Sequence, residues 1–252
     1  MGKSLAHLRR GRLSSRELSQ LSSVRSSRGR LKLNRLRTAR GRKAVAFFDY
    51  MRDRVRIEML DSIKKFQQGR IRKSQLEFRL RSAIRDAMTE LFDVGFWTGG
   101  TSQREVTDEE RRWLKSAIRD EMKYVNKFIK DVVAGKLKMP VEKRVDMYID
   151  TLYGLMTSAR VIGAPPTVVI NWVAEHDGRV CASCQYLRRN SPYSKASLPT
   201  SPRSGDTLCL TRCRCQLDIR EVGEAEFERV QRRQRSKEYH LRQLRRIQRQ
   251  RR

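Results

Sequence analysis

Between residues 44 and 163, apolar side chains recur every three or four positions, which is the spacing of one buried helix face. Four such stretches are separated by short polar or glycine-containing segments, so we expect four amphipathic helices packed as an antiparallel bundle. The four apolar stripes are Phe48, Met51, Val55, Met59, Ile63 and Phe66; Leu76, Leu80, Ile84, Met88 and Leu91; Leu114, Ile118, Met122, Val125, Ile129 and Val132; and Val141, Val145, Tyr148, Leu152, Met156 and Ala159.

Local signals mark the expected ends of these helices. The first helical signals begin near Ala44. Ser74–Glu77 and Thr107–Glu110 both have the capping-box pattern, in which a hydroxyl and a carboxylate three residues later satisfy the first free amides of a helix. Pro140 suits the first turn of the fourth helix because proline lacks the amide hydrogen that is unpaired there. Gly95, followed by the sequence WTGGTS, is expected to end the second helix.

The pattern changes after residue 163. Two successive prolines stop the helical spacing, and Thr167–Val173 is short and rich in β-branched residues, which predicts a strand. Residues 185–207 carry serine, proline, lysine and glycine and are expected to form a loop, after which Cys215–Val222 is expected to form a closing strand. The predicted fold class is therefore mainly α: a helical domain over residues 44–163, then a small α+β module over residues 164–222 that contains every cysteine.

Charge separates the two ends of the chain from its middle. The net charge is +29, of which +13 lies in residues 1–43 and +7 in residues 219–252. We expect residues 1–43 to be a basic arm that is disordered when free, and residues 223–252 to be a basic helix or tail. An organellar transit peptide is an alternative interpretation of the arginine- and serine-rich start. No apolar run long enough to span a membrane occurs, and no secretory signal is expected.

A charge of this sign predicts a polyanionic partner, because like charges repel unless they are neutralised. Arginine-rich arms bind the phosphate backbone of DNA without reading its bases. The alternative for the C-terminal arm is a solvated helix that docks on a protein through Leu241, Leu244 and Ile247. The residues expected to contact nucleic acid are Arg9, Arg10, Arg12, Arg28, Arg30, Lys32, Arg35, Arg37, Arg40, Arg42, Lys43, Arg232, Arg233, Arg235, Arg242, Arg245 and Arg246.

All five cysteines lie within thirty-five residues, as Cys181-x2-Cys184 and Cys209-x3-Cys213-x-Cys215. A small, loop-rich module buries too little apolar area to be stable alone, and a tetrahedral Zn²⁺ held by thiolates supplies the missing folding energy. Zinc needs four ligands, so either one cysteine is surplus or the site is irregular. Cys181 and Cys184 are expected ligands, and in the second cluster Cys209 and Cys213 rank slightly ahead of Cys215. His176, nearby in sequence, could substitute. Reduced structural cysteines, redox or disulfide chemistry, and an iron–sulfur cluster remain alternatives.

The cysteine module resembles the phage head morphogenesis proteins, the Mu F-like minor head proteins of tailed phages. The resemblance rests on WVAEHDGRVCASCQYL and CRCQL, that is, on Trp172, Asp177, Arg179, Val180, Cys181, Cys184, Cys213 and Cys215. It extends over roughly residues 45–220, but only the cysteine module is specific. The family commonly has His-Pro before its Cys-Arg-Cys, where this chain has Leu210-Thr211-Arg212 preceded by Cys209.

The resemblance implies a minor head protein that acts in head morphogenesis and in DNA packaging or delivery. No enzymatic activity is expected, because an all-thiolate zinc site is closed and the sequence supports no Ser-His-Asp set. Its implied partners are DNA and the portal and capsid proteins, and several copies per head are an option. Its implied location is the capsid interior of the virion, with the host cytoplasm during assembly. A zinc-module DNA- or RNA-binding regulator is the alternative function. A metal-dependent nuclease ranks third, because such enzymes use two or three histidines on one element and His176 is the only histidine outside the arms.

Overall fold

The computed structural model describes residues 39–99, 104–175, 179–204 and 206–236. The chain divides into two compact units, Met1–Gly163 and Ala164–Arg252. Most of the predicted N-terminal arm, the end of the C-terminal arm, and His176 lie outside the described residues. Among the described helices, none combines the length and the apolar character needed to cross a membrane.

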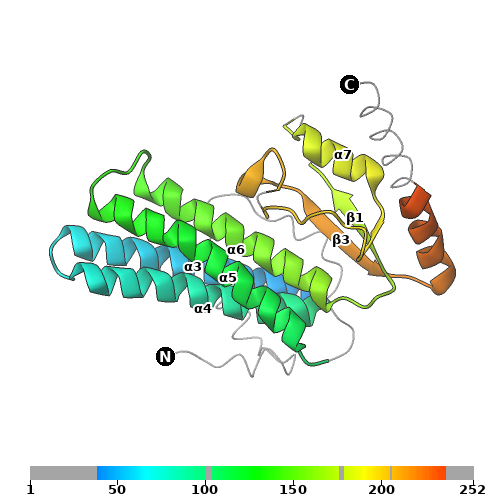
Figure 1. Cartoon of the computed structure of the whole chain (residues 1–252), viewed down its shortest axis with the longest axis horizontal. Coiled ribbons are helices and arrows are strands. Elements are labelled where there is room, and N and C mark those ends of the chain that lie inside the picture. Colours follow the sequence, from blue (N-terminus) through cyan, green and yellow to red (C-terminus); the bar gives the residue numbers. More distant parts are fainter. Residues whose placement is uncertain (1–38, 100–103, 176–178, 205, 237–252) are drawn as a thin grey trace, which may run out of the picture. The chain divides into compact units, whose positions relative to one another are not determined.

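The first unit consists of four long helices: α3 (Ala39–Gln67), α4 (Lys73–Gly99), α5 (Asp108–Val133) and α6 (Val141–Gly163). Successive helices run in opposite directions (Figure 1), as short connections require. The predicted mainly helical class is therefore confirmed. α3 begins five residues before the expected start at 44, so Arg40, Arg42 and Lys43 belong to a helix rather than to the arm.

The four apolar stripes meet in one core. Of the twenty-three stripe residues predicted above, most are buried, and Phe66, Leu114, Ile118, Met122 and Val141 are partly buried and pack against the core. α4 is the central helix, since it packs against α3, α5 and α6. Edge-to-face packing of Phe48 on Tyr153, with ring centroids 5.2 Å apart, joins α3 to α6.

Two predictions about α4 are wrong. Ser74 does not cap it, because the helix has already started at Lys73, and the side chain of Gln75 instead accepts a hydrogen bond from the Arg72 amide at 2.9 Å. Gly95 does not end it, because the helix continues to Gly99, which lies in the WTGGTS segment that was also expected to break the helix. The reason is packing: a Cβ at Gly95 would collide with the carbonyl oxygen of Met156 and lie 2.9 Å from the Cβ of Ala159. Glycine here permits close approach of two helices.

The predicted capping box of α5 is confirmed. Thr107 accepts a hydrogen bond from the Glu110 amide at 3.3 Å, and the Glu110 carboxylate accepts one from the Thr107 amide at 2.9 Å. The guanidinium of Arg104 also donates to Glu110, at 2.5 and 3.0 Å, and it lowers the pKa of this carboxyl to about 2. The start of α5 is therefore stabilised both by capping hydrogen bonds to the backbone and by the Arg104–Glu110 ion pair.

The surroundings of Glu121, a carboxylate of α5, oppose its ionisation. Burial raises its pKa from 4.5 to about 7, and the nearby charge of Arg144 offsets only part of this effect. The pKa of Glu121 is higher in the folded state than in the unfolded state. The ionisation of Glu121 therefore lowers the free energy of unfolding as the pH rises from 4.5 to 7, and it has no further effect above pH 7. The penalty is absent at pH 4.

Replacing Glu121 with glutamine should remove this pH dependence. We expect E121Q to be more stable than wild type at pH 8 by about 1–2 kcal/mol, after allowance for partial exposure, and equally stable at pH 4. Urea unfolding at both pH values measures the difference. The same substitution at exposed Glu105 is the control and should follow the wild-type profile. Equal stabilities of E121Q and wild type at pH 8 would contradict the raised pKa of Glu121.

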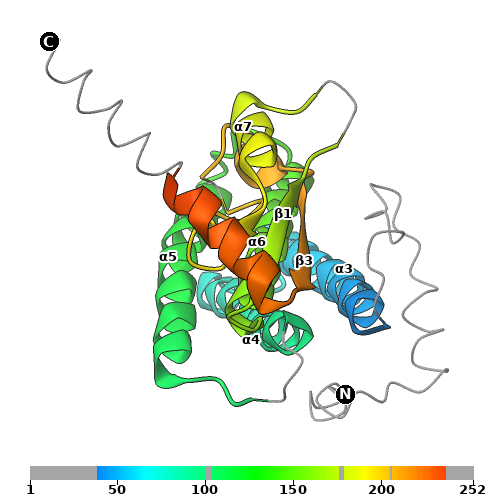
Figure 2. The same cartoon turned by 90° about the vertical axis from the view of Figure 1, so that its right-hand side faces the viewer.

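The second unit is built on a small antiparallel sheet of strand order β2-β1-β3. Its strands are β1 (Val168–Val173), β2 (Tyr193–Ser194) and β3 (Gln216–Glu221), so both predicted strands are confirmed to within one residue at each end. The predicted loop is only partly a loop, because helix α7 (Ala182–Asn190) and strand β2 lie in its first part, up to Ser194. Figure 2 shows α7 beside β1, with which it is in contact.

A further helical segment follows β3, over residues 224–236. Val230 anchors it as a buried side chain, and the Gln234 amide donates hydrogen bonds to the carbonyl oxygens of Asn190, at 2.9 Å, and Pro192. The start of the predicted basic tail is therefore a docked helix. Arg232, Arg233 and Arg235 are exposed on it, whereas Arg242, Arg245 and Arg246 lie outside the described residues.

Candidate metal centre

The five cysteines come from three places in the second unit. Cys181 is the N-cap of α7 and Cys184 lies in its first turn. Cys209 and Cys213 flank the short 3-10 helix η2 (Leu210–Arg212) as its two caps. Cys215 directly precedes β3. Two turns and a strand end thus bring together thiols that are up to thirty-four residues apart in sequence.

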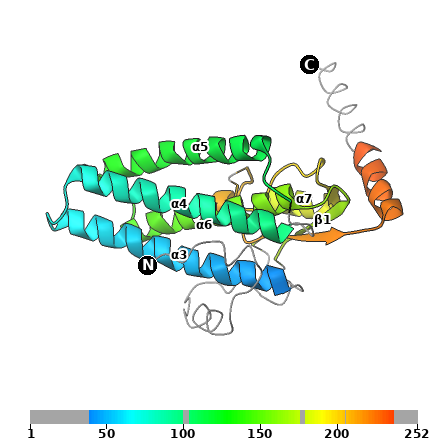
Figure 3. The same cartoon turned by 90° about the horizontal axis from the view of Figure 1, so that it is seen from below.

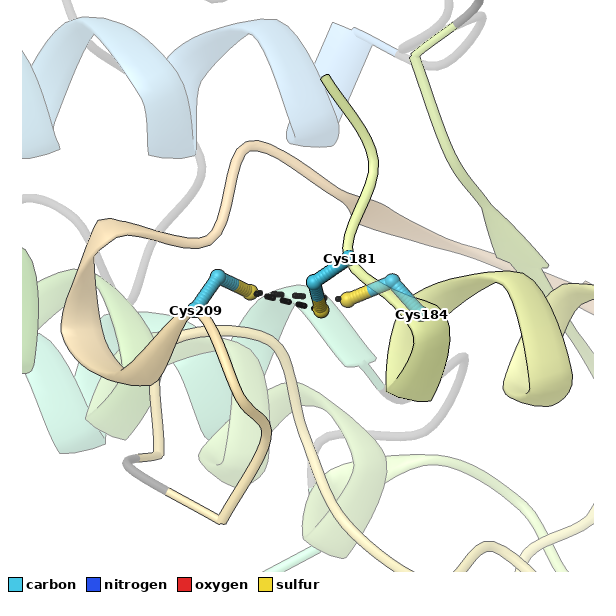
Figure 4. A group of neighbouring side chains, drawn as sticks. All are labelled: Cys181, Cys184 and Cys209. Carbon is cyan, nitrogen blue, oxygen red and sulfur yellow. Dashed lines mark hydrogen bonds between the residues drawn. The ribbon is translucent and has the colours of Figure 1, made fainter. Parts of the chain in front are cut away.

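Three pairs of sulfur atoms lie at distances suited to ligands of a shared metal ion. The Sγ of Cys209 is 3.5 Å from that of Cys181 and 3.6 Å from that of Cys184, and the Sγ of Cys184 is 3.5 Å from that of Cys213. Figure 4 shows the first three thiols pointing toward one another. A Zn–S bond of about 2.3 Å places the sulfurs of a tetrahedral site about 3.8 Å apart. A disulfide would need about 2.05 Å, and all five cysteines are free.

Cys184 occupies the middle of the cluster. The thiols of Cys181, Cys184 and Cys209 lie within 4.8 Å of one another, and so do those of Cys184, Cys213 and Cys215. Cys184 is the member common to both groups. The five predicted ligands therefore converge, and the cluster could hold a metal ion.

Crowding of the thiols disfavours thiolates in the absence of a cation. Burial raises the pKa of Cys184 and of Cys209, and the neighbouring Cys215 thiol together with burial raises that of Cys213. Cys181 differs: burial raises its pKa, but the amides and thiols of Cys184 and Cys209 outweigh burial and lower it. The start of α7 adds the partial positive charge of a helix N-terminus, which favours a thiolate.

The surrounding loops are held by side chains that do not belong to the cluster. The Arg203 guanidinium donates to the carbonyl oxygen of Cys213 at 2.7 Å. The Thr207 hydroxyl lies 3.3 Å from the Cys209 sulfur, and the Ser183 hydroxyl accepts from the Leu208 amide at 3.4 Å. Contacts of this kind orient ligands before a metal binds.

A pocket opens onto four of the thiols, those of Cys181, Cys184, Cys209 and Cys215, and charged side chains line it. Arg179, Arg212 and Arg214 contribute three positive charges, and Glu175 contributes one negative charge. A divalent ion held by four thiolates has a net charge of about −2, which this surplus of arginine would offset. Spacing along the sequence could not show that these arginines are neighbours. Arg212 and Arg214 lie at the end of η2 and just after it, whereas Arg179 lies before α7.

Of the other predicted site residues, the structure describes few. Arg232, Arg233 and Arg235 are exposed, the side chains of Arg40, Arg42 and Lys43 are not described, and the remaining basic residues of the arms lie outside the described ranges. No family model matches the chain, and neither a curated protein nor a solved structure matches it.

Proposed function

We propose that the second unit is a zinc-stabilised module, with Cys181, Cys184, Cys209 and Cys213 as the four ligands. The observation that carries the proposal is the convergence of all five thiols from three separate segments. The four named sulfurs form a continuous series of contacts of 3.5–3.6 Å, whereas Cys215 is grouped only with Cys184 and Cys213. Thiolates are the ligands that Zn²⁺ prefers in closed structural sites.

A structural role suits the composition of this unit. Its sheet has three short strands, one of them of two residues, and a two- or three-stranded sheet alone is marginally stable. A zinc site held by four thiolates has no open position for a substrate or an activated water, so we propose that the centre is not catalytic.

For the whole protein we propose the role of a minor head protein of a tailed phage, inside the capsid near the portal. The residues that carry the resemblance support this role, because Cys181, Cys184 and Cys213 are three of the four proposed ligands. The net charge of +29 supports it independently, since a protein that faces packed DNA needs positive charge. The basic arms would contact the DNA backbone, and assembly contacts would be made with portal and capsid proteins.

DNA binding by the full-length protein tests the role of the arms. We expect non-specific binding to duplex DNA that weakens by about 10³–10⁵ between 50 and 200 mM salt, as six to ten phosphate contacts predict. Removal of residues 1–38, which end just before α3, should weaken binding and make its salt dependence shallower. Fluorescence titrations with two unrelated duplexes measure both.

Two outcomes would contradict the proposal. Sequence preference that persists at high salt would favour a regulatory protein, because base contacts depend little on ion release. Metal-stimulated cleavage of the duplex that is lost in His176→Ala would favour a nuclease. Portal and capsid genes beside the coding gene would support the head role.

A further inference from the structure

Helix α5 carries a dense row of positive charge on its solvent side. The row, here called the basic ridge, consists of side chains that are all exposed: Arg111, Arg112, Lys115, Arg119, Lys123, Lys127 and Lys130. Five of them, from Arg111 to Lys127, are spaced by four residues throughout. This ridge lies within the folded helical unit and is independent of both arms.

Helix geometry makes the ridge continuous. Each residue turns the helix by about 100°, so each step of four advances by about 40° and the seven side chains fall within an arc of about 160°. The buried residues of α5, Val125, Phe128, Ile129 and Val132, lie on the side that packs into the bundle. Figure 3 shows α5 at the edge of the four helices, beside α4.

Little negative charge compensates the ridge. Between residues 111 and 130 the acids are Asp120 and Glu121. Asp120 pairs with Lys123 at 2.7 Å, and burial raises the pKa of Glu121 to about 7, so that it is only partly ionised near neutral pH. Arg111 and Arg119 donate to neutral oxygens of Val106 and Ser116, which leaves their charge in place.

We propose that the basic ridge of α5 is a second binding surface for the phosphate backbone of nucleic acid. A step of four residues places a cation about every 6 Å along the helix axis, and the ridge spans about 29 Å, equivalent to about eight base pairs of B-DNA. A regular, linear polyanion can engage such a row along its whole length. The proposal deepens the DNA-binding role given above and assigns part of it to the folded unit.

Two full-length variants with the same charge change test this surface. The ridge variant replaces Arg112, Lys115, Arg119, Lys123 and Lys127 with glutamine, which preserves helix propensity. The control replaces five exposed basic residues scattered over the same unit with glutamine: Arg70, Arg79, Arg85, Lys136 and Lys138. The measurement is affinity for a non-specific duplex as a function of salt.

The affinity of the ridge variant for duplex DNA should fall about a hundredfold at 100 mM salt. The slope of log affinity against log salt concentration should become shallower by about 3–4, because each lost phosphate contact reduces this slope by about 0.9. The scattered control should change the slope by less than about 1. Equal behaviour of the two variants would overturn the inference. If removal of residues 1–38 leaves binding intact while the ridge variant loses it, the role of that arm fails and the inference stands.

Lysine acetylation of the wild-type protein gives an answer without any substitution. Adding duplex DNA should slow acetylation of Lys115, Lys123 and Lys127, while Lys136 and Lys138 in the α5–α6 connection keep their rates. Peptide mass spectrometry reads both sets in one sample. Unchanged rates at the three ridge lysines with DNA bound would overturn the inference, as would their protection by an acidic protein partner but not by DNA.

Discussion

Replacing Cys184 with serine should abolish metal binding and unfold the second unit while leaving the helical unit folded. Cys184 is the thiol common to both groups of the cluster, so its loss breaks contacts to Cys209 and Cys213 together. A structural zinc contributes about 10–16 kcal/mol to folding of small zinc domains. Because this unit has a small sheet and few buried apolar residues, we expect no stable fold without the ion.

Amide hydrogen exchange followed by mass spectrometry measures the effect unit by unit. In Cys184→Ser, amides of β1, β3 and α7 should lose protection, and those of α4 and α6 should keep it. Cys215→Ser is the matched control, since it removes a buried thiol that the proposed ligand set leaves out. Full protection of the second unit in Cys184→Ser, or equal damage in both variants, would contradict the proposed ligands.

Replacing Gly95 with valine should destabilise the helical unit by about 3 kcal/mol, near the upper end of what overpacking usually costs. Any Cβ at this position meets the Met156 carbonyl oxygen, and backbone cannot move aside as a flexible side chain can. Gly99 and Gly163 face the same restriction, against the carbonyl oxygens of Arg160 and Phe96. The close packing between the C-terminal parts of α4 and α6 therefore depends on these three glycines.

Thr89→Val is the control for this substitution, because it places a valine at an exposed position of the same helix. The Thr89 hydroxyl that is lost makes a local hydrogen bond to the Arg85 carbonyl oxygen at 3.0 Å, so we expect only a small change in stability. Urea unfolding followed by the helical circular dichroism signal compares the two. A Gly95→Val protein as stable as Thr89→Val would show that the two helices do not approach as closely as described.

The sequence predicted the helical unit well, because its apolar spacing repeats over many turns and each stripe fills one face. It failed at Gly95 because glycine between helical residues signals either an end or a close contact, and only the facing helix decides which. It failed at Ser74 because the capping pattern also occurs one residue inside a helix. α7 was missed because its nine residues are too few for an apolar stripe to repeat, and Cys184 and Leu187 alone are buried.

The candidate site was predicted as a set of residues but not as an arrangement. Clustering of five cysteines indicates a shared centre and ranks Cys209 and Cys213 only slightly ahead of Cys215, because spacing does not show which sulfur atoms meet. That ranking depends on the caps of η2, which orient two of them toward Cys184. The arginines of the pocket are likewise brought together by folding, since Arg179 lies far from Arg212 and Arg214 in the sequence. The basic ridge of α5 has a regular spacing of four residues, but only the folded unit shows that this face of the helix is exposed.

The most direct test of the metal centre is X-ray absorption at the zinc edge of the purified full-length protein, together with its metal content. The proposal predicts about one zinc per chain and a first shell of four sulfurs at about 2.3 Å, with no nitrogen or oxygen ligand. Protein that is folded throughout both units without any metal, or a first shell dominated by nitrogen or oxygen, would contradict it.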